Sequence, residues 1–519
     1  MNGADILTDT LLASGIDVCF ANPGTSEMHF VAALDRKPEM RCVLGLSETV
    51  VTGAADGYAR MADKPAATLL HTGPGLANGL ANLHNARRAR TPMVNIVGDH
   101  ATHHLAYDAP LTSDIEGLAR PMSDWVGRIA DAADVAPRTR EAITQARATP
   151  GVATLVLPAD AAWTEVDASV AAQAAEAPPP RPLDPAAIAA AASALRSGRR
   201  VGLMMSGHAL RADALDVAGR IAAATGARLL CQMSNSRVAR GRGRVDVGRV
   251  PYVVDQALAF LADLETVILI GAKPPVAFFA YPGKPSSLLA ASCEVLTAAA
   301  AGLDLLAALT ALADAVGAGR GLAGLAAAAA PELPAAPVPG PLTAAAIMAA
   351  VARAIPDNAI VVDESVSSGR NFFALTAAAA PHDYLQLTGG AIGLGIAMAT
   401  GAAIACPGRK VIDLQADGSA LYAAQGLWTQ AREACDVVTV ILSNRSYAIL
   451  EGEMRAVGVR QFGRNARRML SLDEPAIDWV SLAKGFGVQG VRAATVEDFT
   501  RHLATALAAP GPWLIEAVI

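Results

Sequence analysis

The sequence predicts an α/β protein made of three successive parallel-sheet domains. The chain has 519 residues, which is long enough to bury more than one hydrophobic core. Short apolar runs alternate with helical patterns along its whole length, as in parallel α/β sheets. Two proline-rich segments, 174–185 and 326–343, separate three blocks of ordinary domain size. The predicted domains are therefore residues 1–173, 186–325 and 343–519.

The predicted strands are short apolar runs, bounded by turn residues and separated by helical patterns. In the first domain they lie at 17–21, 42–46, 66–70, 93–97 and 153–157, in the middle domain at 201–205, 227–231 and 266–271, and in the last domain at 359–363, 410–415, 437–442 and 513–519. Ligands of open parallel sheets bind beyond the carboxyl ends of the strands. The residues that follow each strand are therefore the first candidates for function.

The composition narrows the class of protein. Hydrophobic residues make up 53% and charged residues 17%, which indicates a globular chain, and the net charge of -6 predicts no nucleic-acid partner. The six cysteines are scattered, which favours a reducing cytoplasm over a disulfide framework. The N-terminal segment carries Asp5 and Asp9 without a basic region, so no signal peptide is expected. The apolar stretch 389–408 nearly reaches membrane length, but we interpret it as a buried helix and predict no membrane association.

Polar residues follow two strands of the last domain. Asp417, Gly418 and Ser419 stand where one strand meets a helix predicted over 420–434, and Asn444 follows the next strand. A strand–helix–strand unit brings both strand ends to one edge of the sheet. Carboxylate and amide oxygens there suit Mg²⁺ beside phosphate, Gly418 permits close backbone approach, and the helix N-terminus favours an anion. The alternative is that Asp417 and Ser419 only cap the helix.

Two polar side chains stand out in the first domain. Glu48 lies between an apolar run and a helix of small residues, so it is predicted to be buried and hence either paired or protonated. It could instead cap the following helix. His71 is predicted to lie between a strand and a turn formed by residues 73–75, where a structural and a functional role are equally open.

Two further segments carry charged or metal-binding residue types. His100, His103 and His104 follow one another in a loop without a cysteine partner, so histidines of a substrate pocket are favoured over a zinc site. The arginines of 236–249 could hold a nucleotide, but a solvated loop is favoured.

Together these residues resemble the thiamine diphosphate-dependent enzymes of the acetolactate synthase, pyruvate decarboxylase and benzoylformate decarboxylase superfamily. The resemblance covers essentially the whole chain, and the family's pyrimidine-binding, middle and diphosphate-binding domains match the three blocks. The family's metal motif begins Gly-Asp-Gly and ends Asn-Asn, whereas this chain reads ADG at 416–418 and SN at 443–444. The resemblance implies Mg²⁺ ligation by Asp417, Asn444 and the backbone carbonyl of Ser446, and both departures fall on non-ligand positions.

The resemblance also implies a set of cofactor-binding residues. Glu48 matches the glutamate that hydrogen-bonds N1′ of the aminopyrimidine. Leu394 matches the residue that holds the cofactor in its bent shape, and Ser367 lies in a second diphosphate-side loop. The implied set is Pro23, Glu48, Ser367, Leu394, Asp417, Gly418, Ser419, Asn444, Ser446 and Tyr447.

The pattern is most similar to benzoylformate decarboxylase, in the last 130 residues and in NPGTSE at 22–27. This similarity implies four catalytic residues: Glu48, His71, Thr25 facing the substrate, and His104 assisting with proton transfer. A second catalytic histidine of that enzyme has no counterpart in 274–284.

The substrate pocket is expected to be apolar. Phe279 and Leu450 are its predicted lining residues, with Phe278 and Ile449 beside them. Acetolactate synthases bind FAD and carry an Asp-Ala-Phe-Gln-Glu loop, but residues 107–114 here read YDAPLTSD, so FAD is not expected.

The predicted function is non-oxidative decarboxylation of a 2-oxo acid, as in benzoylformate decarboxylase, with thiamine diphosphate and Mg²⁺. Two alternatives stay open: carboligation of the acetolactate synthase type, and a homologue that binds the cofactor without turnover. The resemblance implies a homodimer or homotetramer with active sites at the subunit interface.

Overall fold

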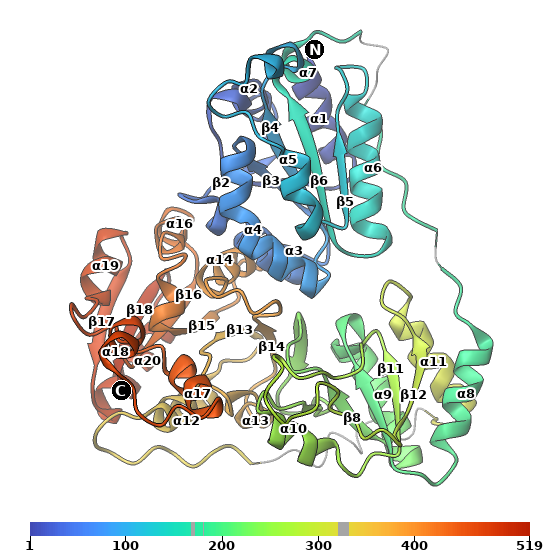
Figure 1. Cartoon of the computed structure of the whole chain (residues 1–519), viewed down its shortest axis with the longest axis vertical. Coiled ribbons are helices and arrows are strands. Elements are labelled where there is room, and N and C mark those ends of the chain that lie inside the picture. The colour runs from blue at the N-terminus through green and yellow to red at the C-terminus, as the bar shows by residue number, and fades with distance from the viewer. Residues whose placement is uncertain (168–171, 180, 320–331) are drawn as a thin grey trace.

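A computed structural model describes residues 1–167, 172–179, 181–319 and 332–519. Three sheets form three lobes, and the strands within each sheet are parallel with one exception (Figure 1). The predicted fold class, three α/β units with parallel sheets, is therefore confirmed. Both proline-rich segments lie partly outside the described residues, and the exact domain boundaries stay a prediction.

The first sheet has six parallel strands in the order β2-β1-β3-β4-β6-β5. They are β1 Val18–Asn22, β2 Arg41–Leu44, β3 Ala66–Leu70, β4 Met93–Asp99, β5 Trp125–Arg128 and β6 Val152–Pro158, with helices α1 Gly3–Ala13, α2 Met28–Asp35, α3 Glu48–Ala62, α4 Thr72–Ala89, α5 Ile115–Ala119, α6 Val135–Ala148 and α7 Ala159–Trp163. All five predicted strands are present. The unpredicted β5 is a half-buried edge strand, so it lacks the continuous apolar run of the others.

The middle sheet has five parallel strands in the order β10-β8-β7-β11-β12. They are β7 Val201–Met205, β8 Arg228–Cys231, β10 Gly248–Arg249, β11 Thr266–Ile270 and β12 Glu294–Ala299, with helices α8 Pro185–Leu195, α9 Ala212–Thr225, α10 Val254–Leu261 and α11 Leu305–Ala315. The three predicted strands are its three central ones, and the two unpredicted strands lie at its edges.

The third sheet has seven strands in the order β17-β18-β16-β15-β13-β14-β9. They are β9 Arg237–Arg240, β13 Ala359–Glu364, β14 His382–Gln386, β15 Val411–Ala416, β16 Val437–Ser443, β17 Gln489–Ala493 and β18 Trp513–Val518. Its helices are α12 Ala344–Ala354, α13 Phe372–Leu375, α14 Gly395–Ala405, α15 Asp417–Ala420, α16 Gly426–Arg432, α17 Ala448–Ala456, α18 Arg464–Leu470, α19 Trp479–Gly485 and α20 Val496–Ala508. Strand β9 comes from the middle region of the sequence and pairs antiparallel with β14.

The expectation of a solvated arginine loop at 236–249 is wrong for Arg237–Arg240, which form strand β9. The Nε atom of Arg237 donates to Asp383 at 2.7 Å, and the buried Arg240 pairs with Asp246 at 2.7 Å. The open edge of β14 accepts this segment as strand β9, and carboxylates of the chain balance the charges that become buried with it. The two guanidinium groups are therefore already occupied by partners within the chain.

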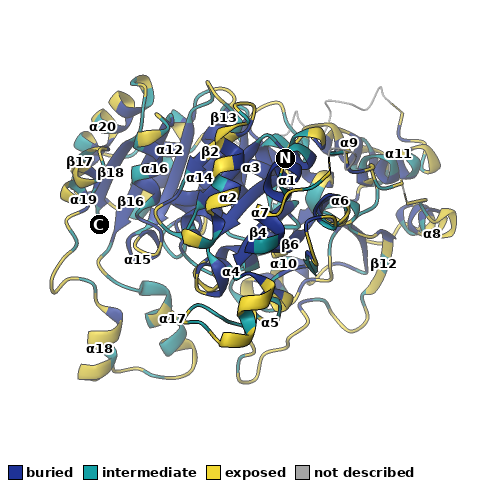
Figure 2. Cartoon of the chain, turned by 90° about the horizontal axis from the view of Figure 1, so that it is seen from above, coloured by how far each residue is buried: buried dark blue, intermediate teal, exposed yellow. Residues whose placement is uncertain are grey.

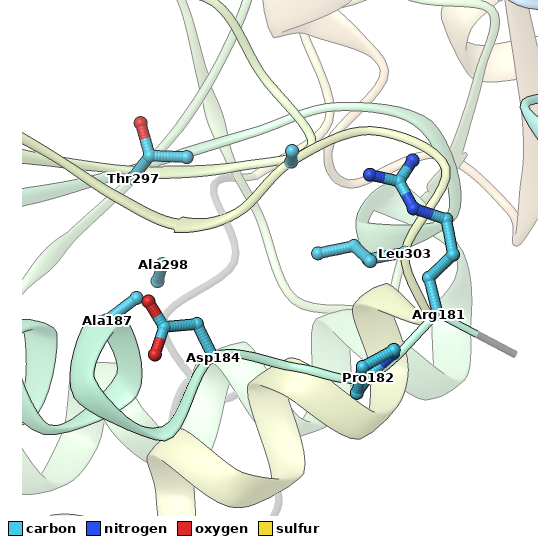
Figure 3. Close-up of a pocket in the computed structure, with 8 residues that line it drawn as sticks. Arg181, Pro182, Asp184, Ala187, Thr297, Ala298 and Leu303 are labelled. Carbon is cyan, nitrogen blue, oxygen red and sulfur yellow. The ribbon is translucent and has the colours of Figure 1, made fainter.

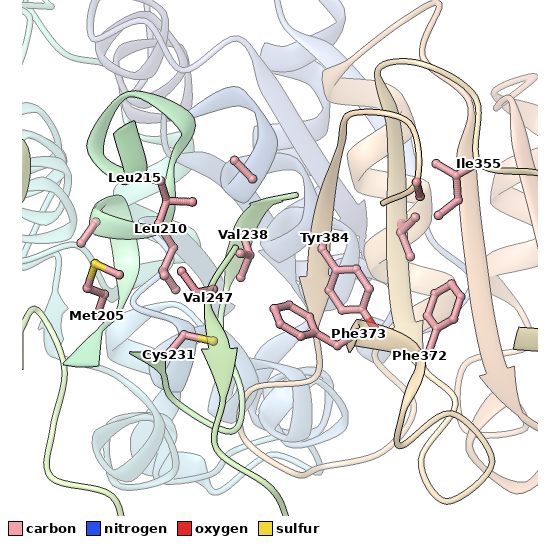
Figure 4. Close-up of a cluster of buried hydrophobic side chains, with 14 of the residues drawn as sticks. Met205, Leu210, Leu215, Cys231, Val238, Val247, Ile355, Phe372, Phe373 and Tyr384 are labelled. Atoms are coloured by element: carbon pink, nitrogen blue, oxygen red, sulfur yellow. The ribbon is translucent and has the colours of Figure 1, made fainter. Parts of the chain in front are cut away.

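A continuous hydrophobic core joins the middle and third sheets across β9. Figure 4 shows Met205 and Val238 on one side and Tyr384 and Phe373 on the other. All four side chains belong to one buried cluster, with Val238 and Tyr384 fully enclosed. The two lobes are therefore held together by burial of apolar surface as well as by strand pairing.

Helices α3 and α14 join the first and third lobes. A Cβ atom at Gly57 would overlap the carbonyl of Met398, and one at Gly401 would overlap the carbonyl of Ala54. Small residues at the crossing therefore let the two helix backbones touch. Residues 395–404 of α14 are all buried, as predicted for the apolar stretch. No helix in the described part of the chain is long and apolar enough to cross a membrane.

The helix predicted over 420–434 is wrong in its extent. The chain forms the short α15, then turns with hydrogen bonds from residue i+3 to residue i, and resumes as α16. These turns bring Ala423 against Val50 and Ala397, so a contact with the first lobe interrupts the helix.

Burial is concentrated in the strands, whereas α17 and α18 lie at an open margin of the molecule and are mostly half-buried or exposed (Figure 2).

Candidate active site

A hydrogen-bonded cluster lies at the carboxyl ends of β1 and β3. His71 Nδ1 lies 2.8 Å from Glu27 Oε2, and the hydroxyl of Ser26 donates to Glu27 Oε1 at 2.5 Å. The backbone N–H of Gly24 donates to the same carboxylate at 2.8 Å, and Glu27 is only 2% exposed. A buried carboxylate with three partners holds its neighbours in fixed positions. It favours the His71 tautomer that carries its proton on Nδ1 and leaves Nε2 free.

Glu48 lies beside this cluster, at the first residue of α3. It is 6% exposed, as predicted, and accepts a hydrogen bond from Asn78 Nδ2 at 3.2 Å. A Cβ atom at Gly75 would stand 2.7 Å from Glu48 Oε1 and 3.3 Å from the Cβ of His71, so both side chains border Gly75. The alternative in which Glu48 caps the helix is not observed, because Ser47 occupies the N-cap and accepts from the N–H of Thr49.

The turn predicted after His71 is wrong. Residues 73–75 lie in the first turn of α4, and Thr72 adopts a left-handed φ of 48°. Since a non-glycine residue in this conformation is strained, the rest of the strand–helix junction must hold it in place. His71 itself occupies the N-cap position without capping the helix, which leaves its ring to Glu27 and Ser26.

The structure does not bring the other predicted residues of this region into the same cluster. Thr25 is exposed and Pro23 half-buried, next to Gly24. The exposed His104 lies against His100 and Tyr107, with ring centroids 5.5 and 5.7 Å apart. No group of three histidine, cysteine, aspartate or glutamate side chains placed to hold a metal ion occurs among the described residues.

The predicted oxygen pair of the third domain does lie on neighbouring strands. β15 and β16 are parallel, with Ala416 opposite Leu442, so Asp417 and Asn444 follow at the same sheet edge. Asp417 Oδ2 accepts the N–H of Arg445 at 2.6 Å, and Asn444 Oδ1 accepts the N–H of Ser446 at 3.0 Å. Arg445, which lies between Asn444 and Ser446 in the sequence, has a left-handed φ of 55°, so the loop turns back sharply on itself.

The donor set at this edge fits a hard divalent cation. Burial raises the pKa of the Asp417 carboxyl, and backbone N–H groups that donate to it oppose the rise. A cation beside Asp417, the amide oxygen of Asn444 and the carbonyl of Ser446 would offset the cost of a buried carboxylate. Magnesium ligation by these three groups stays a prediction.

The other predicted diphosphate-side residues differ in how far they are buried. Ser419 is 3% exposed within α15, and Ser367 is half-buried. Tyr447 packs over Gly418, where a Cβ atom would overlap its ring. Gly418 therefore makes room for this tyrosine, which the sequence does not indicate.

A buried glutamate that the sequence reasoning missed holds the segment around Leu394. Glu364, at the end of β13, accepts the N–H groups of Gly393 at 2.7 Å and Gly395 at 2.5 Å. Burial raises its pKa to about 7, and these hydrogen bonds oppose the rise. Leu394 itself is completely buried in the core that joins the first and third lobes, so its predicted contact with a cofactor stays untested.

One hydrogen-bonded bridge connects the surroundings of Glu48 and Leu394. Asn82 Nδ2 donates to the carbonyl of Thr49 at 2.9 Å and to that of Gly393 at 3.3 Å. Among the described residues, Glu48 and Asp417 share no hydrogen bond. The candidate residues therefore form two groups, one on the first sheet and one on the third, and we refer to these groups as half-sites.

The predicted pocket residues lie on exposed segments of the middle and third domains. Phe279 is 56% exposed and Leu450 45% exposed, and Phe278 packs edge-on against Phe279 with ring centroids 4.8 Å apart. Phe278 also reaches the third domain, where it covers Gly390. A separate cavity of ≈ 420 Å³ lies before α8 and beside β12, with Arg181 and Asp184 at its wall (Figure 3), and no predicted site residue lines it.

Comparison with known proteins agrees with this arrangement. The thiamine pyrophosphate enzyme N-terminal TPP binding domain matches residues 1–118, and the C-terminal TPP binding domain of the same enzymes matches 368–517. The chain is 50% identical to the Mycobacterium tuberculosis protein named "Putative acetolactate synthase large subunit IlvX", over 100% of this chain and 99% of that protein. It is 30% identical to the benzoylformate decarboxylase of Pseudomonas aeruginosa, over 98% of this chain and 97% of that enzyme.

A solved structure shares the complete fold. The thiamine diphosphate-dependent 4-hydroxybenzoylformate decarboxylase of Rhodococcus jostii RHA1 superimposes with a TM-score of 0.86 at 26% identity, covering 100% of this chain and 99% of that one. The chain is therefore an enzyme of the thiamine diphosphate (thiamine pyrophosphate) class. Within that class it belongs to the family that contains the decarboxylases and acetolactate synthases.

The buried carboxylate of Glu27 leads to a first prediction. Glu27→Gln is expected to lower turnover by about 10²-fold, because the amide presents one oxygen where the carboxylate presents two and no longer stabilises a protonated His71. The pH dependence of turnover should shift, while cofactor affinity stays near wild type. Glu294→Gln, a change of the same kind at an exposed ion pair with Arg199 in the middle domain, is the matched control. An unchanged pH profile in a folded Glu27 variant would exclude Glu27 from positioning His71.

Proposed function

We propose that this enzyme catalyses the Mg²⁺-dependent, non-oxidative decarboxylation of a 2-oxo acid with a bulky acyl group. The observation that carries the proposal is the buried Glu27–His71–Ser26 cluster next to Glu48. Thiamine diphosphate, when bound, supplies a carbon nucleophile and an electron sink for cleavage beside the keto group. The protein must then supply binding, orientation and proton transfer.

Each half-site has a distinct task in this proposal. Asp417, Asn444 and the carbonyl of Ser446 would hold Mg²⁺ against the diphosphate. Glu48 would exchange a proton with a ring nitrogen of the pyrimidine. The Nε2 atom of His71 is free because Nδ1 faces Glu27. Once the ring is protonated at Nε2, His71 would deliver that proton to the reacting carbon after CO₂ leaves.

Carboligation of the acetolactate synthase type is the second candidate. The name of the 50% identical relative favours it. The resemblance to benzoylformate decarboxylases, together with Phe278 and Phe279 beside Leu450, favours a larger acyl group that loses CO₂. The two candidates differ in what reacts with the acyl carbon after CO₂ leaves. In decarboxylation this carbon takes up a proton, and in carboligation it bonds to a second carbonyl compound.

Product analysis with two substrates separates these candidates. We expect phenylglyoxylate to be converted to benzaldehyde and CO₂ with a higher kcat/KM than pyruvate, because each added methylene-sized group in an apolar pocket is worth roughly 10- to 200-fold. Detection of CO₂ and of the organic product by chromatography gives kcat/KM for both substrates. Faster use of pyruvate with formation of a 2-hydroxy-3-oxo acid would select carboligation. No product from any of a broad panel of 2-oxo acids would indicate a binding homologue.

We further propose a homodimer or homotetramer in the cytoplasm, with each active site shared between subunits. Three exposed apolar side chains near the two half-sites support this: Leu46 is 44%, Leu421 38% and Tyr422 55% exposed. Exposed side chains of this size, when they gather, commonly mark an interface.

Light scattering should give at least a dimer. Since a site shared between chains needs Glu48 from one and Asp417 from the other, mixing subunits of Glu48→Gln and Asp417→Ala should restore activity. Random mixed dimers would regain about a quarter of the wild-type sites. An active monomer would refute the shared site. Mixed dimers without activity, although subunit exchange is demonstrated, would refute it as well.

A further inference from the structure

Three polar side chains meet at the junction of the middle and third domains. The hydroxyl of Tyr252 donates to Glu453 Oε1 at 3.2 Å, and its ring packs against Phe278 with centroids 5.5 Å apart. Tyr281 lies near both residues, since, besides burial, its hydroxyl contributes to the raised pKa of Tyr252 and Glu453 contributes to the raised pKa of Tyr281. We refer to Tyr252, Tyr281 and Glu453 as the polar cluster.

The polar cluster borders the predicted acyl pocket. Glu453 follows Leu450 by one turn of α17, so both side chains lie on the same face of that helix. Phe278, which touches Tyr252, neighbours Phe279 and covers Gly390.

The loop that carries Ser367 reaches the same place. Arg370, at its end, lies 5.4 Å from the centroid of the Tyr252 ring. The predicted diphosphate-side loop, the glycine segment before Leu394, α17 and the middle-domain aromatics therefore converge on this cluster.

The carboxylate of Glu453 retains unused acceptor capacity. Two carboxylate oxygens offer about four acceptor positions, and the tyrosine hydroxyls use two at most. Among the described residues, the neighbouring Glu451 pairs with Arg455, whereas Glu453 forms no ion pair. Burial raises the pKa of the Tyr252 hydroxyl, so it remains a donor. The remaining positions around Glu453 are open to a donor from a ligand, because this carboxylate is only half-buried.

We propose that the polar cluster is a specificity subsite that binds a hydrogen-bond donor at the far end of the substrate's acyl group. This inference rests on the proposed function, and it narrows the substrate class to 2-oxo acids whose bulky side chain ends in a hydroxyl or ammonium group. Phe278, Phe279 and Leu450 contact the apolar middle of that side chain, and Glu453 accepts from its tip. An anionic tip is disfavoured because it would face the carboxylate.

Two ligand pairs test the subsite. The substrates are phenylglyoxylate and 4-hydroxyphenylglyoxylate, and the unreactive analogues are mandelate and 4-hydroxymandelate, which have no keto group. We expect wild-type protein, loaded with thiamine diphosphate and Mg²⁺, to favour the hydroxylated member of each pair by about 10- to 100-fold, as for a hydrogen bond to a charged group. Calorimetry measures the binding affinity of each analogue, and the rate of CO₂ release measures the turnover of each substrate.

Substitutions at Glu453 complete the test. Glu453→Leu should abolish or invert the preference, and Glu453→Gln, which still accepts a hydrogen bond, should keep part of it. Glu141→Gln, on the exposed side of α6, should leave it unchanged. Cofactor affinity should be equal in all variants, which shows that each is folded.

The outcomes separate the subsite from the proposed function. Turnover of both substrates without a preference, or a preference that survives Glu453→Leu, would refute the subsite and leave the decarboxylase proposal intact. Analogue binding with the expected preference but no CO₂ would support the subsite and refute the decarboxylase proposal. No binding of either analogue and no turnover would refute both.

Discussion

Glu48→Gln is expected to lower turnover by about 10²- to 10⁴-fold, the usual contribution of a positioned proton-transfer group. Glutamine preserves the size of the side chain and can still form hydrogen bonds, but its amide cannot give up and take back a proton. The diphosphate end of the site at Asp417 and Asn444 is untouched, so cofactor affinity should fall only modestly. Stopped assays of turnover and calorimetric titration of the cofactor, on the same preparation, give both quantities.

A purely structural role of Glu48 predicts a different result. The N-cap of α3 is Ser47, and the carboxylate of Glu48 accepts only from Asn78 among the described side chains. If this hydrogen bond served stability alone, the substitution would cost on the order of 1 kcal/mol of unfolding free energy and leave the rate per folded molecule intact. The melting temperature measured alongside turnover distinguishes the two roles, and near wild-type turnover would remove Glu48 from the mechanism.

Asp417→Ala should weaken Mg²⁺-dependent binding of thiamine diphosphate by more than about 10²-fold, because loss of even an outer-shell partner of a metal commonly costs 10- to 100-fold. The alanine removes the only charged group of the proposed ligand set and leaves the cation to neutral oxygens. The N–H of Arg445 also loses its acceptor, so the loop after β16 should become less ordered. Titration calorimetry with and without Mg²⁺ measures the effect.

Asp314→Ala is a matched control, since this aspartate is exposed on α11 of the middle domain. It should leave cofactor affinity and its Mg²⁺ dependence unchanged. Unaltered affinity in a folded Asp417→Ala variant would show that the third domain does not anchor the diphosphate through a cation at this edge.

Local sequence patterns were sufficient for most strands and for the edge that carries Asp417 and Asn444. Buried strands such as β7 are continuous apolar runs, which are visible without any knowledge of their partners. Once two strands flank one helix, parallel pairing places both carboxyl ends together, so the position of Asn444 relative to Asp417 follows from chain order.

Features that depend on distant partners could not be predicted in this way. Strand β9 forms only because β14 offers it an open edge, and its arginines are buried only because Asp383 and Asp246 receive them. The helix at 420–434 is interrupted by packing of Ala423 against another lobe. In each case a tertiary contact outweighs the local propensity.

In the candidate site, too, the residues that the sequence did not indicate depend on contacts between distant parts of the chain. Glu27 stands within the NPGTSE motif, but its significance comes from a bond to His71, which is 44 positions away in sequence. Glu364 acts through the N–H groups of Gly393 and Gly395, which only the fold brings near. A carboxylate directly after an apolar strand, as at Glu364, is the local signal that could have pointed to it.

We propose that this enzyme removes CO₂ from a 2-oxo acid with a cofactor held between the first-sheet half-site of one subunit and the third-sheet half-site of another. The most direct test uses protein stripped of cofactor and of divalent cations, incubated with phenylglyoxylate and 4-hydroxyphenylglyoxylate. The predicted result is release of CO₂ and of the matching aldehyde only when thiamine diphosphate and Mg²⁺ are both added, and at least about 10²-fold less with Glu48→Gln. Release that needs neither addition, or no release with both although the cofactor binds, would contradict the account.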